Sequence, residues 1–263
     1  MKNKKSLGQN WLKDRPTLEQ IADLAVDLPE HSLEKDVQLC LEIGPGLGTL
    51  TSSLLKRFKK VLAVEFDEQL AHNLPQSFPG KNLKVKNEDF LKFNLEEIKE
   101  PYVAAGNIPY YITTPIIEKL LTAEHKPENI VLLVQKEVAE KICPRESKLH
   151  NSSLSLFVEN FAEPKLGPVV TKDLFTPPPK VDSQVLVLAP RQKPLVDDGV
   201  LVFIHKSFAN PRKKLSANLA QFTNQSKIDL EKILTENHIS PSARPADLTL
   251  GDYATLAKTL KTR

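Results

Sequence analysis

The residues of this chain whose types and spacing suit chemistry fall into four short groups, each placed at the end of a run typical of a strand. The groups are Glu42 with Gly44, Gly46 and Gly48; Glu65; Asp89 with Phe90; and Asn107 with Pro109 and Tyr110. Carboxylates suit the hydroxyl and amino groups of a nucleoside, and an aromatic ring suits the flat face of a base. Together the groups predict a nucleoside site beside a reactive exocyclic amine.

The first group is a glycine-rich turn that follows the apolar residues 39–43. Three of the 9 glycines of the chain lie within positions 44–48, and glycine lets a ligand approach the main chain closely. The spacing Glu42-x-Gly44-x-Gly46-x-Gly48 differs from the G-x-G-x-x-G pattern that binds a pyrophosphate at a helix N-terminus. The acid at the strand end favours a ligand that carries a cation. A turn that joins a strand to a helix without any ligand is the structural alternative.

Glu65 and the pair Asp89-Phe90 follow the next two expected strands. A carboxylate at the tip of a second strand commonly accepts both hydroxyl hydrogens of a ribose diol, although a surface acid at a helix start accounts for Glu65 equally well. Asp89 can accept from an adenine amino group while Phe90 lies against the ring. No obvious phosphate-binding lysine accompanies these residues, so they describe a nucleoside site.

Asn107-Ile-Pro-Tyr110 is the most specific short pattern in the chain. The side-chain carbonyl of Asn107 and a backbone carbonyl at the rigid Pro109 bend can accept both hydrogens of a planar amine. The amine lone pair then points at an electrophile while the base stacks on Tyr110, so positioning replaces a strong general base. A strand turn with a packed tyrosine is the non-functional alternative.

The elements that must position these groups alternate between strand and helix. Expected strands cover residues 39–43, 61–65, 83–87, 102–106, 130–134, 157–161 and 181–188, and expected helices cover 17–28, 50–58, 68–74, 114–121 and 136–142, with Thr114 as the N-cap before Pro115. This alternation predicts an α/β fold with a Rossmann-like, doubly wound, mostly parallel sheet. Ligands of such sheets bind at the carboxyl ends of the strands, where all four groups would meet.

Charge and composition divide the 263-residue chain into two parts. Residues 199–263 hold ten basic and five acidic residues, whereas the chain as a whole has a net charge of only +3. We expect a first domain at 1–190, a linker at 191–198 and a small all-helical domain at 199–263, with helices near 200–208, 212–222, 227–237 and 250–261. The basic excess favours a polyanionic partner.

Several classes of protein are disfavoured by the composition. No apolar run approaches the ~20 residues that span a bilayer, so we expect no membrane association. Cys40 and Cys143 offer neither a disulfide framework nor metal spacing. We therefore expect a cytoplasmic protein without a metal.

These motifs resemble those of the ribosomal RNA small-subunit adenine N6-dimethyltransferases, a family of class I S-adenosylmethionine-dependent methyltransferases. The likeness covers nearly the whole chain and is carried by residues 5–12, 41–51, 107–115, 134–140, 175–183, 212–215 and 244–248. Several blocks in the family's order are far more specific than a single glycine motif.

The resemblance implies a role for each matching residue. For the cofactor it implies Gln9, Asn10 and Leu12 from an N-terminal arm, Gly44, Gly46 and Gly48 around the amino-acid part, Glu65 at the ribose, and Asp89 and Phe90 at the adenine, with Glu42 and Asn107 as further cofactor-binding residues. For the target adenosine it implies Asn107 and Pro109 at the amine, with Tyr110 and Phe175 sandwiching the base. Arg212, Lys213 and Lys214 would bind RNA, and the non-functional alternative is that they form a solvent-exposed helix face.

Two segments depart from the family pattern. Trp11 stands where the family usually has phenylalanine, and a larger ring there would reshape the arm. The segment 143–153 lacks the usual glycine after the arginine and the usual tyrosine after the lysine, which leaves Lys148 without an assigned role.

The resemblance implies a monomeric enzyme of ribosome biogenesis that dimethylates two adjacent adenosines near the 3′ end of small-subunit (16S) ribosomal RNA. S-adenosylhomocysteine would be the second product, and the partner would be that RNA or a small-subunit precursor. Three alternatives stay open: a non-catalytic RNA-binding assembly factor, a large-subunit adenine methylase of the macrolide-resistance type, and a nicotinamide dehydrogenase. The glycine spacing and the lack of a hydride-transfer residue set weaken the last.

Overall fold

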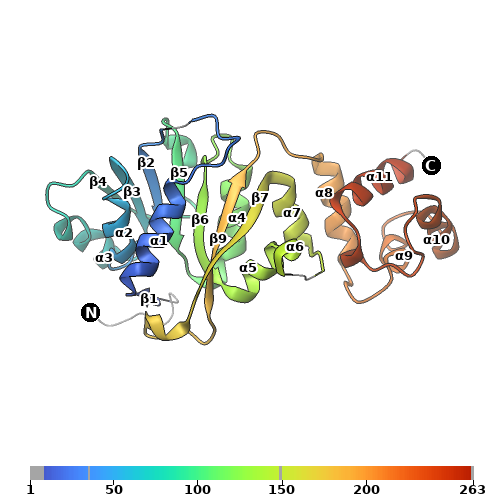
Figure 1. Cartoon of the computed structure of the whole chain (residues 1–263). Coiled ribbons are helices and arrows are strands. Elements are labelled where there is room, and N and C mark those ends of the chain that lie inside the picture. The colour runs from blue at the N-terminus through green and yellow to red at the C-terminus, as the bar shows by residue number, and fades with distance from the viewer. Residues whose placement is uncertain (1–8, 35, 148–149, 262–263) are drawn as a thin grey trace. The chain divides into compact units, whose positions relative to one another are not determined.

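A computed structural model describes residues 9–34, 36–147 and 150–261 of the chain (Figure 1). Contacts divide the chain into two compact units, 1–139 with 162–190 and 140–161 with 191–263. The expected single boundary at residue 190 therefore differs from the division seen. Residues 140–161 group with the second unit because Leu156 lies in that unit's core and the Asn160 side chain accepts the amide hydrogen of Val196 at 2.8 Å.

The first unit is a seven-stranded sheet with helices on its faces. Its elements are β1 (Trp11–Leu12), α1 (Arg15–Val26), β2 (Leu39–Ile43), α2 (Thr49–Leu54), β3 (Lys60–Glu65), α3 (Glu68–Asn73), β4 (Leu83–Asn87), β5 (Tyr102–Asn107), α4 (Thr113–Thr122), β6 (Ile130–Gln135), β7 (Ala162–Val170), β8 (Phe175–Thr176) and β9 (Ser183–Pro190). The helix α5 (Lys136–Ile142) continues from β6 across the boundary between the units.

The strand order is β4-β3-β2-β5-β6-β9-β7, and β9 runs antiparallel to both neighbours while the others share one direction. The predicted Rossmann-like, mostly parallel sheet is confirmed. The chain leaves β2 towards β3 on one side and returns to β5 on the other, which makes the β2–β5 boundary the switch point where such sheets bind ligands. Parallel pairing of Glu65 with Asn87 brings two of the expected strand tips into line.

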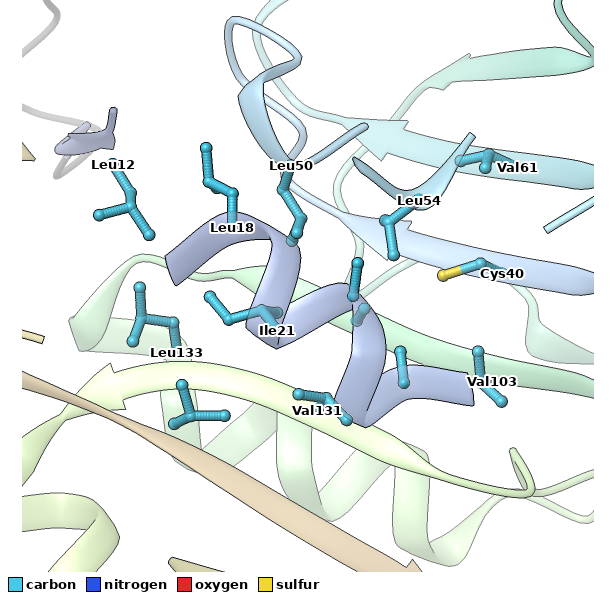
Figure 2. Close-up of a cluster of buried hydrophobic side chains, with 14 of the residues drawn as sticks. Leu12, Leu18, Ile21, Cys40, Leu50, Leu54, Val61, Val103, Val131 and Leu133 are labelled. Atoms are coloured by element: carbon cyan, nitrogen blue, oxygen red, sulfur yellow. The ribbon is translucent and has the colours of Figure 1, made fainter. Parts of the chain in front are cut away.

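The sheet face that carries Cys40 is covered by α1 and α2. Figure 2 shows Leu18 and Ile21 of α1 directed at the sheet, with Leu50 and Leu54 of α2 beside them. Because side chains alternate along a strand, Glu42 lies on this same face, two residues after Cys40. Each of these fully buried leucine and isoleucine side chains stabilises the unit by about 1.5–3 kcal/mol. The core thus holds β2 and α2 on either side of the glycine turn.

An ion-pair network joins α1 to the turn after α2. Arg57 Nη1 lies 2.6 Å from a Glu19 carboxylate oxygen and Arg57 Nη2 lies 2.6 Å from Asp23. Lys56 Nζ also contacts Glu19 at 2.6 Å. Hydrogen bonds from Lys56 and then from Arg57 lower the pKa of Glu19 to about 2.

The structure contradicts the expected strand at 157–161 and the expected N-cap at Thr114, and it adds one strand that was not expected. Residues 157–161 end a helix, α7 (Ser153–Phe161), rather than forming a strand. Ser152 and Ser155 cap its start reciprocally, each hydroxyl accepting the other residue's amide hydrogen. The edge strand β7 was not expected because it contains two prolines and a glycine, which only an edge position tolerates. The helix α4 begins at Thr113 after Ile112, so Thr114 is not its N-cap.

The second unit contains helices and no strand among its described residues. Besides α7 its elements are α6 (Pro144–Ser147), α8 (Asp198–Ser207), α9 (Leu215–Leu219), α10 (Lys227–Glu236) and α11 (Leu250–Lys261). Leu156, Ile204 and Leu230 belong to one buried cluster, and the Tyr253 hydroxyl donates to the Pro245 carbonyl at 2.8 Å. The expected small helical domain is present, enlarged by α6 and α7. None of the helices described is long and apolar enough to cross a membrane.

Candidate active site

A pocket lies at the carboxyl ends of β2, β3 and β5, between the glycine turn and the N-terminal arm at residues 9–12. The expected site residues that line it are Gln9, Asn10, Glu42, Gly44, Gly46, Glu65, Asp89, Phe90, Asn107, Pro109 and Tyr110. These residues are separated by up to about 100 positions in the sequence, and only the parallel register brings them together.

Three expected site residues lie elsewhere. The side chains of Leu12 and Phe175 are 0% and 3% exposed and belong to the core that α1 covers. Neither lines the pocket. Phe175 therefore lies outside the pocket that Tyr110 lines, whereas the expected arrangement has both rings beside the target base. Gly48 instead begins α2 with φ +81, and a Cβ there would approach Leu74 Cδ1 to 2.6 Å. Its role is to let α2 pack closely.

Leu12 and Phe175 hold the N-terminal arm in place. The short strands β1 and β8 pair antiparallel, with Leu12 opposite Phe175 and Trp11 opposite Thr176. This pairing sets Trp11 over the glycine turn, where its indole Nε1 would lie 3.1 Å from a Cβ placed at Gly46. The larger ring at the family's phenylalanine position thus forms part of the pocket wall. The other half of this motif, residues 5–8, lies outside the described residues.

Glu65 is buried at the end of β3, where its carboxylate accepts two backbone hydrogens. Gly46 N donates to Oε2 at 3.0 Å and Asp67 N donates to Oε1 at 2.8 Å. Burial raises the pKa of Glu65, and these backbone hydrogen bonds oppose the rise. Each carboxylate oxygen keeps a second lone pair, so Glu65 can hold the glycine turn and still accept a hydroxyl hydrogen of a ligand.

The pocket is acidic. Glu42, Glu65 and Asp89 line it, and the described lining residues include no lysine, arginine or histidine. A phosphate group would meet three carboxyl groups and no counter-charge, whereas a cationic nucleoside would meet a complementary surface. No group of three metal-ligating side chains suited to a metal ion occurs among the residues that the structure describes.

Asn107 is oriented by the N-terminal arm. Its Nδ2 donates to the backbone carbonyl of Asn10 at 3.0 Å. A carbonyl oxygen can only accept a hydrogen bond, so the NH₂ group of the Asn107 amide must face Asn10. The Oδ1 atom then points away from Asn10. The side chain is thereby prepared as an acceptor. The Pro109 carbonyl accepts the Ile112 amide hydrogen at 3.2 Å and keeps one lone pair.

Aromatic side chains surround this acceptor. The Tyr110 hydroxyl lies 2.7 Å from the Ser183 hydroxyl, and burial raises the Tyr110 pKa. Phe66 and Tyr111 also line the pocket, although 61% and 65% exposed. The sequence analysis missed both. Their signal was present, because each aromatic directly follows a predicted site residue.

The expected RNA-binding residues lie in the second unit. Arg212, Lys213 and Lys214 are exposed and precede α9 instead of lying in a helix that begins at residue 212. Lys214 Nζ lies 3.4 Å from Glu231. Lys148 lies outside the described residues.

The family model described as "Ribosomal RNA adenine dimethylase" matches residues 1–262. The chain belongs to the ribosomal RNA adenine dimethylase family. Ribosomal RNA small subunit methyltransferase A of Bacillus cytotoxicus is 37% identical, over 98% of this chain and 91% of that protein. The protein of the same name from Bacillus thuringiensis (strain Al Hakam) is 36% identical with the same coverage.

Solved structures of methyltransferases have the same fold. A dimethyladenosine transferase from Plasmodium falciparum aligns with a TM-score of 0.76 and 25% identity, over 95% of this chain and 97% of that one. The 23S rRNA methyltransferase ErmE aligns with a TM-score of 0.74 and 28% identity, over 95% of this chain and 99% of ErmE. Both alignments span nearly the whole chain, so this family member has the fold of class I ribosomal RNA methyltransferases.

Proposed function

We propose that this protein transfers methyl groups from S-adenosylmethionine to N6 of two adjacent adenosines near the 3′ end of small-subunit ribosomal RNA, during ribosome assembly. The orientation of Asn107 carries the proposal. Its Oδ1 is left as an acceptor at the end of β5, beside Tyr110 and in the pocket that also holds Glu65. An amide oxygen held as a free acceptor in this way can accept a hydrogen from an amine.

The residues of the pocket fit S-adenosylmethionine. Its ribose diol matches Glu65, its adenine matches Asp89 and Phe90 with Phe66 beside them, and its positive charges match a wall without basic side chains. Gln9, Asn10, Gly44 and Gly46 would enclose it. When bound, it supplies an electrophilic methyl group on a cationic sulfur.

The chain's own residues position the nucleophile. Asn107 Oδ1 accepts one hydrogen of the adenosine amine, and the remaining lone pair of the Pro109 carbonyl accepts the other. The two bonds aim the nitrogen lone pair into the pocket, while Tyr110, held by Ser183, supports the ring. Positioning of this kind contributes much of a transfer barrier without a strong base. The proton is lost to solvent after methyl transfer has made the nitrogen acidic.

The choice of small-subunit RNA rests on the bacterial relatives at 36–37% identity. The second unit, with exposed Arg212, Lys213 and Lys214, would grip the RNA backbone through charge. We propose that the protein acts in the cytoplasm as a monomer and requires no metal. A large-subunit substrate is the second candidate, because ErmE shares the fold at 28% identity.

The test is labelled methyl transfer from S-adenosylmethionine to small ribosomal subunits that lack the modification. Asn107→Ala should lower transfer by at least 10²-fold while binding of the cofactor is retained, because the positioned acceptor is lost. Asn94→Ala, a matched change at an exposed residue that caps a short helical turn, should transfer at the wild-type rate.

The outcomes separate the alternatives. Transfer to large but not small subunits would favour the ErmE-type substrate. Wild-type protein that binds small subunits and transfers nothing would favour a non-catalytic assembly factor. Equal activity of wild type and Asn107→Ala would refute the catalytic assignment.

A further inference from the structure

Glu42 holds an acceptor atom that the protein itself leaves unused. The residue is 1% exposed, at the switch point of the sheet. Its Oε2 accepts the Thr51 hydroxyl hydrogen at 2.6 Å, whereas Oε1 has no hydrogen-bond partner. Among the described residues with a buried, unpartnered side-chain atom, Glu42 is the one that lines the pocket. Leaving a buried polar atom without a partner is destabilising, and a ligand group that pairs with it removes that cost.

The groups that surround Glu42 supply no positive charge. Those with a titratable side chain are Cys40 on β2, Glu65 at the end of β3, Asp67 after it, and Asp89, Tyr110 and Tyr111 across the pocket. The adjoining stretches, α2 on one side and residues 9–12 of the arm on the other, contain no titratable side chain. The acids of α1, Glu19 and Asp23, are held by Arg57. Among the described residues, no cation therefore pairs with the buried cluster of Glu42 and Glu65, and the charge of Lys119 on α4 acts on Asp89 across the pocket.

Such a cluster favours the neutral carboxyl group. Burial raises the pKa of Glu42 to about 8, with a smaller rise from the charge of Glu65, while the Thr51 hydrogen bond opposes both. A positive charge brought close to Oε1 would reverse this balance, because an opposite charge within ~4–6 Å stabilises the ionised form.

We infer that the pocket takes up its cationic cofactor in exchange for a proton, which leaves the Glu42 carboxyl group as the positive charge of the ligand arrives. The inference rests on the proposed function, since S-adenosylmethionine carries that charge as a sulfonium and an ammonium group. One O–H bond of Glu42 breaks, its proton passes to the buffer, and the new carboxylate pairs with the cation through Oε1. No other co-reactant is needed.

The test is isothermal titration calorimetry of the full chain with S-adenosylmethionine at pH 7.0, in phosphate and in Tris. These buffers differ in ionisation enthalpy, so the difference in observed heat counts the protons released per ligand bound. Wild type should release about one proton. Glu42→Gln keeps the shape and the Thr51 contact but has no proton to give, and its release should fall close to zero. Glu118→Gln, a matched change at an exposed carboxyl group on α4 outside the pocket, should keep the wild-type proton count.

A second variant keeps the inference testable if Glu42→Gln does not fold. Thr51→Val removes the hydroxyl that stabilises the carboxylate, so its empty pocket should hold the proton to higher pH. At pH 8.5 the wild-type release should fall below its value at pH 7.0, while Thr51→Val should still release about one proton.

A comparison of two ligands shows which positive charge of the cofactor pairs with Glu42. S-adenosylhomocysteine keeps the ammonium group and lacks the sulfonium charge. Equal release with both ligands would assign the amino group as the partner of Glu42, and release with S-adenosylmethionine alone would assign the sulfonium. Binding without proton release, or equal release from wild type and Glu42→Gln, would overturn the inference and leave the proposed function standing. If S-adenosylmethionine gives no binding heat, the proposed assignment of the cofactor is wrong.

Discussion

At the scale of single residues, the pocket is defined by where lone pairs and charges are left without protein partners. Asn107 donates from its amide nitrogen to the arm and keeps its oxygen as an acceptor, whereas Glu65 accepts from the glycine turn and keeps further lone pairs for the pocket. Glu42 keeps one carboxylate oxygen, Oε1, without a hydrogen-bond partner. These choices suit a ligand that donates hydrogens and carries positive charge.

Glu42 should make the stability of the empty protein depend on pH. Its ordinary pKa of 4.5 in the unfolded chain rises to about 8 on folding, so between these values the folded state binds more protons. The free energy of unfolding should therefore fall as pH rises through this window, by up to ~1.4 kcal/mol per pH unit. Urea unfolding followed by the fluorescence of Trp11, the single tryptophan, measures this in the first unit.

Glu42→Gln should remove most of this fall in stability. A smaller slope should remain, because the pKa of Glu65 is raised as well. Glu19 affects stability in a different pH range. Because its pKa is lowered on folding, its contribution to the free energy of unfolding is lost only as pH falls below 4.5. An unchanged slope in the variant would show that Glu42 ionises normally in the folded protein.

Tyr111 should contribute to RNA binding rather than to the fold. Its ring is 65% exposed at the pocket, next to the expected base site, and stacking of a base on an aromatic ring is worth about 1–3 kcal/mol. Tyr111→Ala should weaken binding of an RNA hairpin about tenfold, as measured by fluorescence anisotropy, with a smaller effect on cofactor affinity. Tyr111→Phe keeps the ring and should bind like wild type; a loss as large as that of alanine would argue against stacking.

At the scale of elements, the site depends on close contact between the ends of β2 and β5. A Cβ at Gly106 would lie 2.6 Å from the backbone carbonyl oxygen of Ile43. Backbone cannot yield as a flexible side chain can, so only glycine permits this spacing one residue before Asn107. The register of two strands and the position of the acceptor are thereby linked.

Gly106→Ala should therefore lower both stability and transfer. Overpacking of this kind costs about 1–3 kcal/mol, which urea unfolding followed through Trp11 would detect, and methyl transfer should fall further than the folded fraction explains. Gly251→Ala is the matched control, because in α11 the nearest atom to the new Cβ would be 3.7 Å away. It should leave stability within about 1 kcal/mol of wild type. A Gly106→Ala protein as stable and active as wild type would show that the strands can separate freely.

At the scale of the whole molecule, the pocket and the basic stretch lie in different units. The sheet unit holds every residue that lines the pocket. The helical unit holds the exposed Arg212, Lys213 and Lys214 in a stretch without the acidic excess of the rest of the chain. Charge there acts on a polyanion without regard to sequence.

Changing Arg212, Lys213 and Lys214 together to alanine should weaken RNA binding and reduce its dependence on salt. If all three neutralise phosphates, the slope of log affinity against log salt concentration should flatten by about 2 to 3. Cofactor binding should be unchanged. The control is Lys227→Ala with Lys232→Ala on α10, both exposed. Equal slopes for the two sets would show that the basic excess acts through net charge and not through this stretch.

Local sequence was enough to find the strand tips that line the pocket. Glu42, Glu65, Asp89 and Asn107 each lie at or just after the end of an expected strand, and parallel strands must bring their carboxyl ends to one edge. This is a rule of backbone geometry that needs no knowledge of packing. The order of blocks along the chain also identified the family correctly.

Tertiary structure alone decided which side chains face the pocket from irregular segments. The pairing of Leu12 with Phe175 joins residues far apart in sequence; it turns both into the core and leaves Tyr111, not Phe175, exposed at the pocket. Residues 153–161 form a helix that places Leu156 in the core of the helical unit. Side-chain direction in such segments follows from long-range contacts, which short-range periodicity does not contain. The unpartnered oxygen of Glu42 arises in the same way, because it depends on what the assembled pocket lacks.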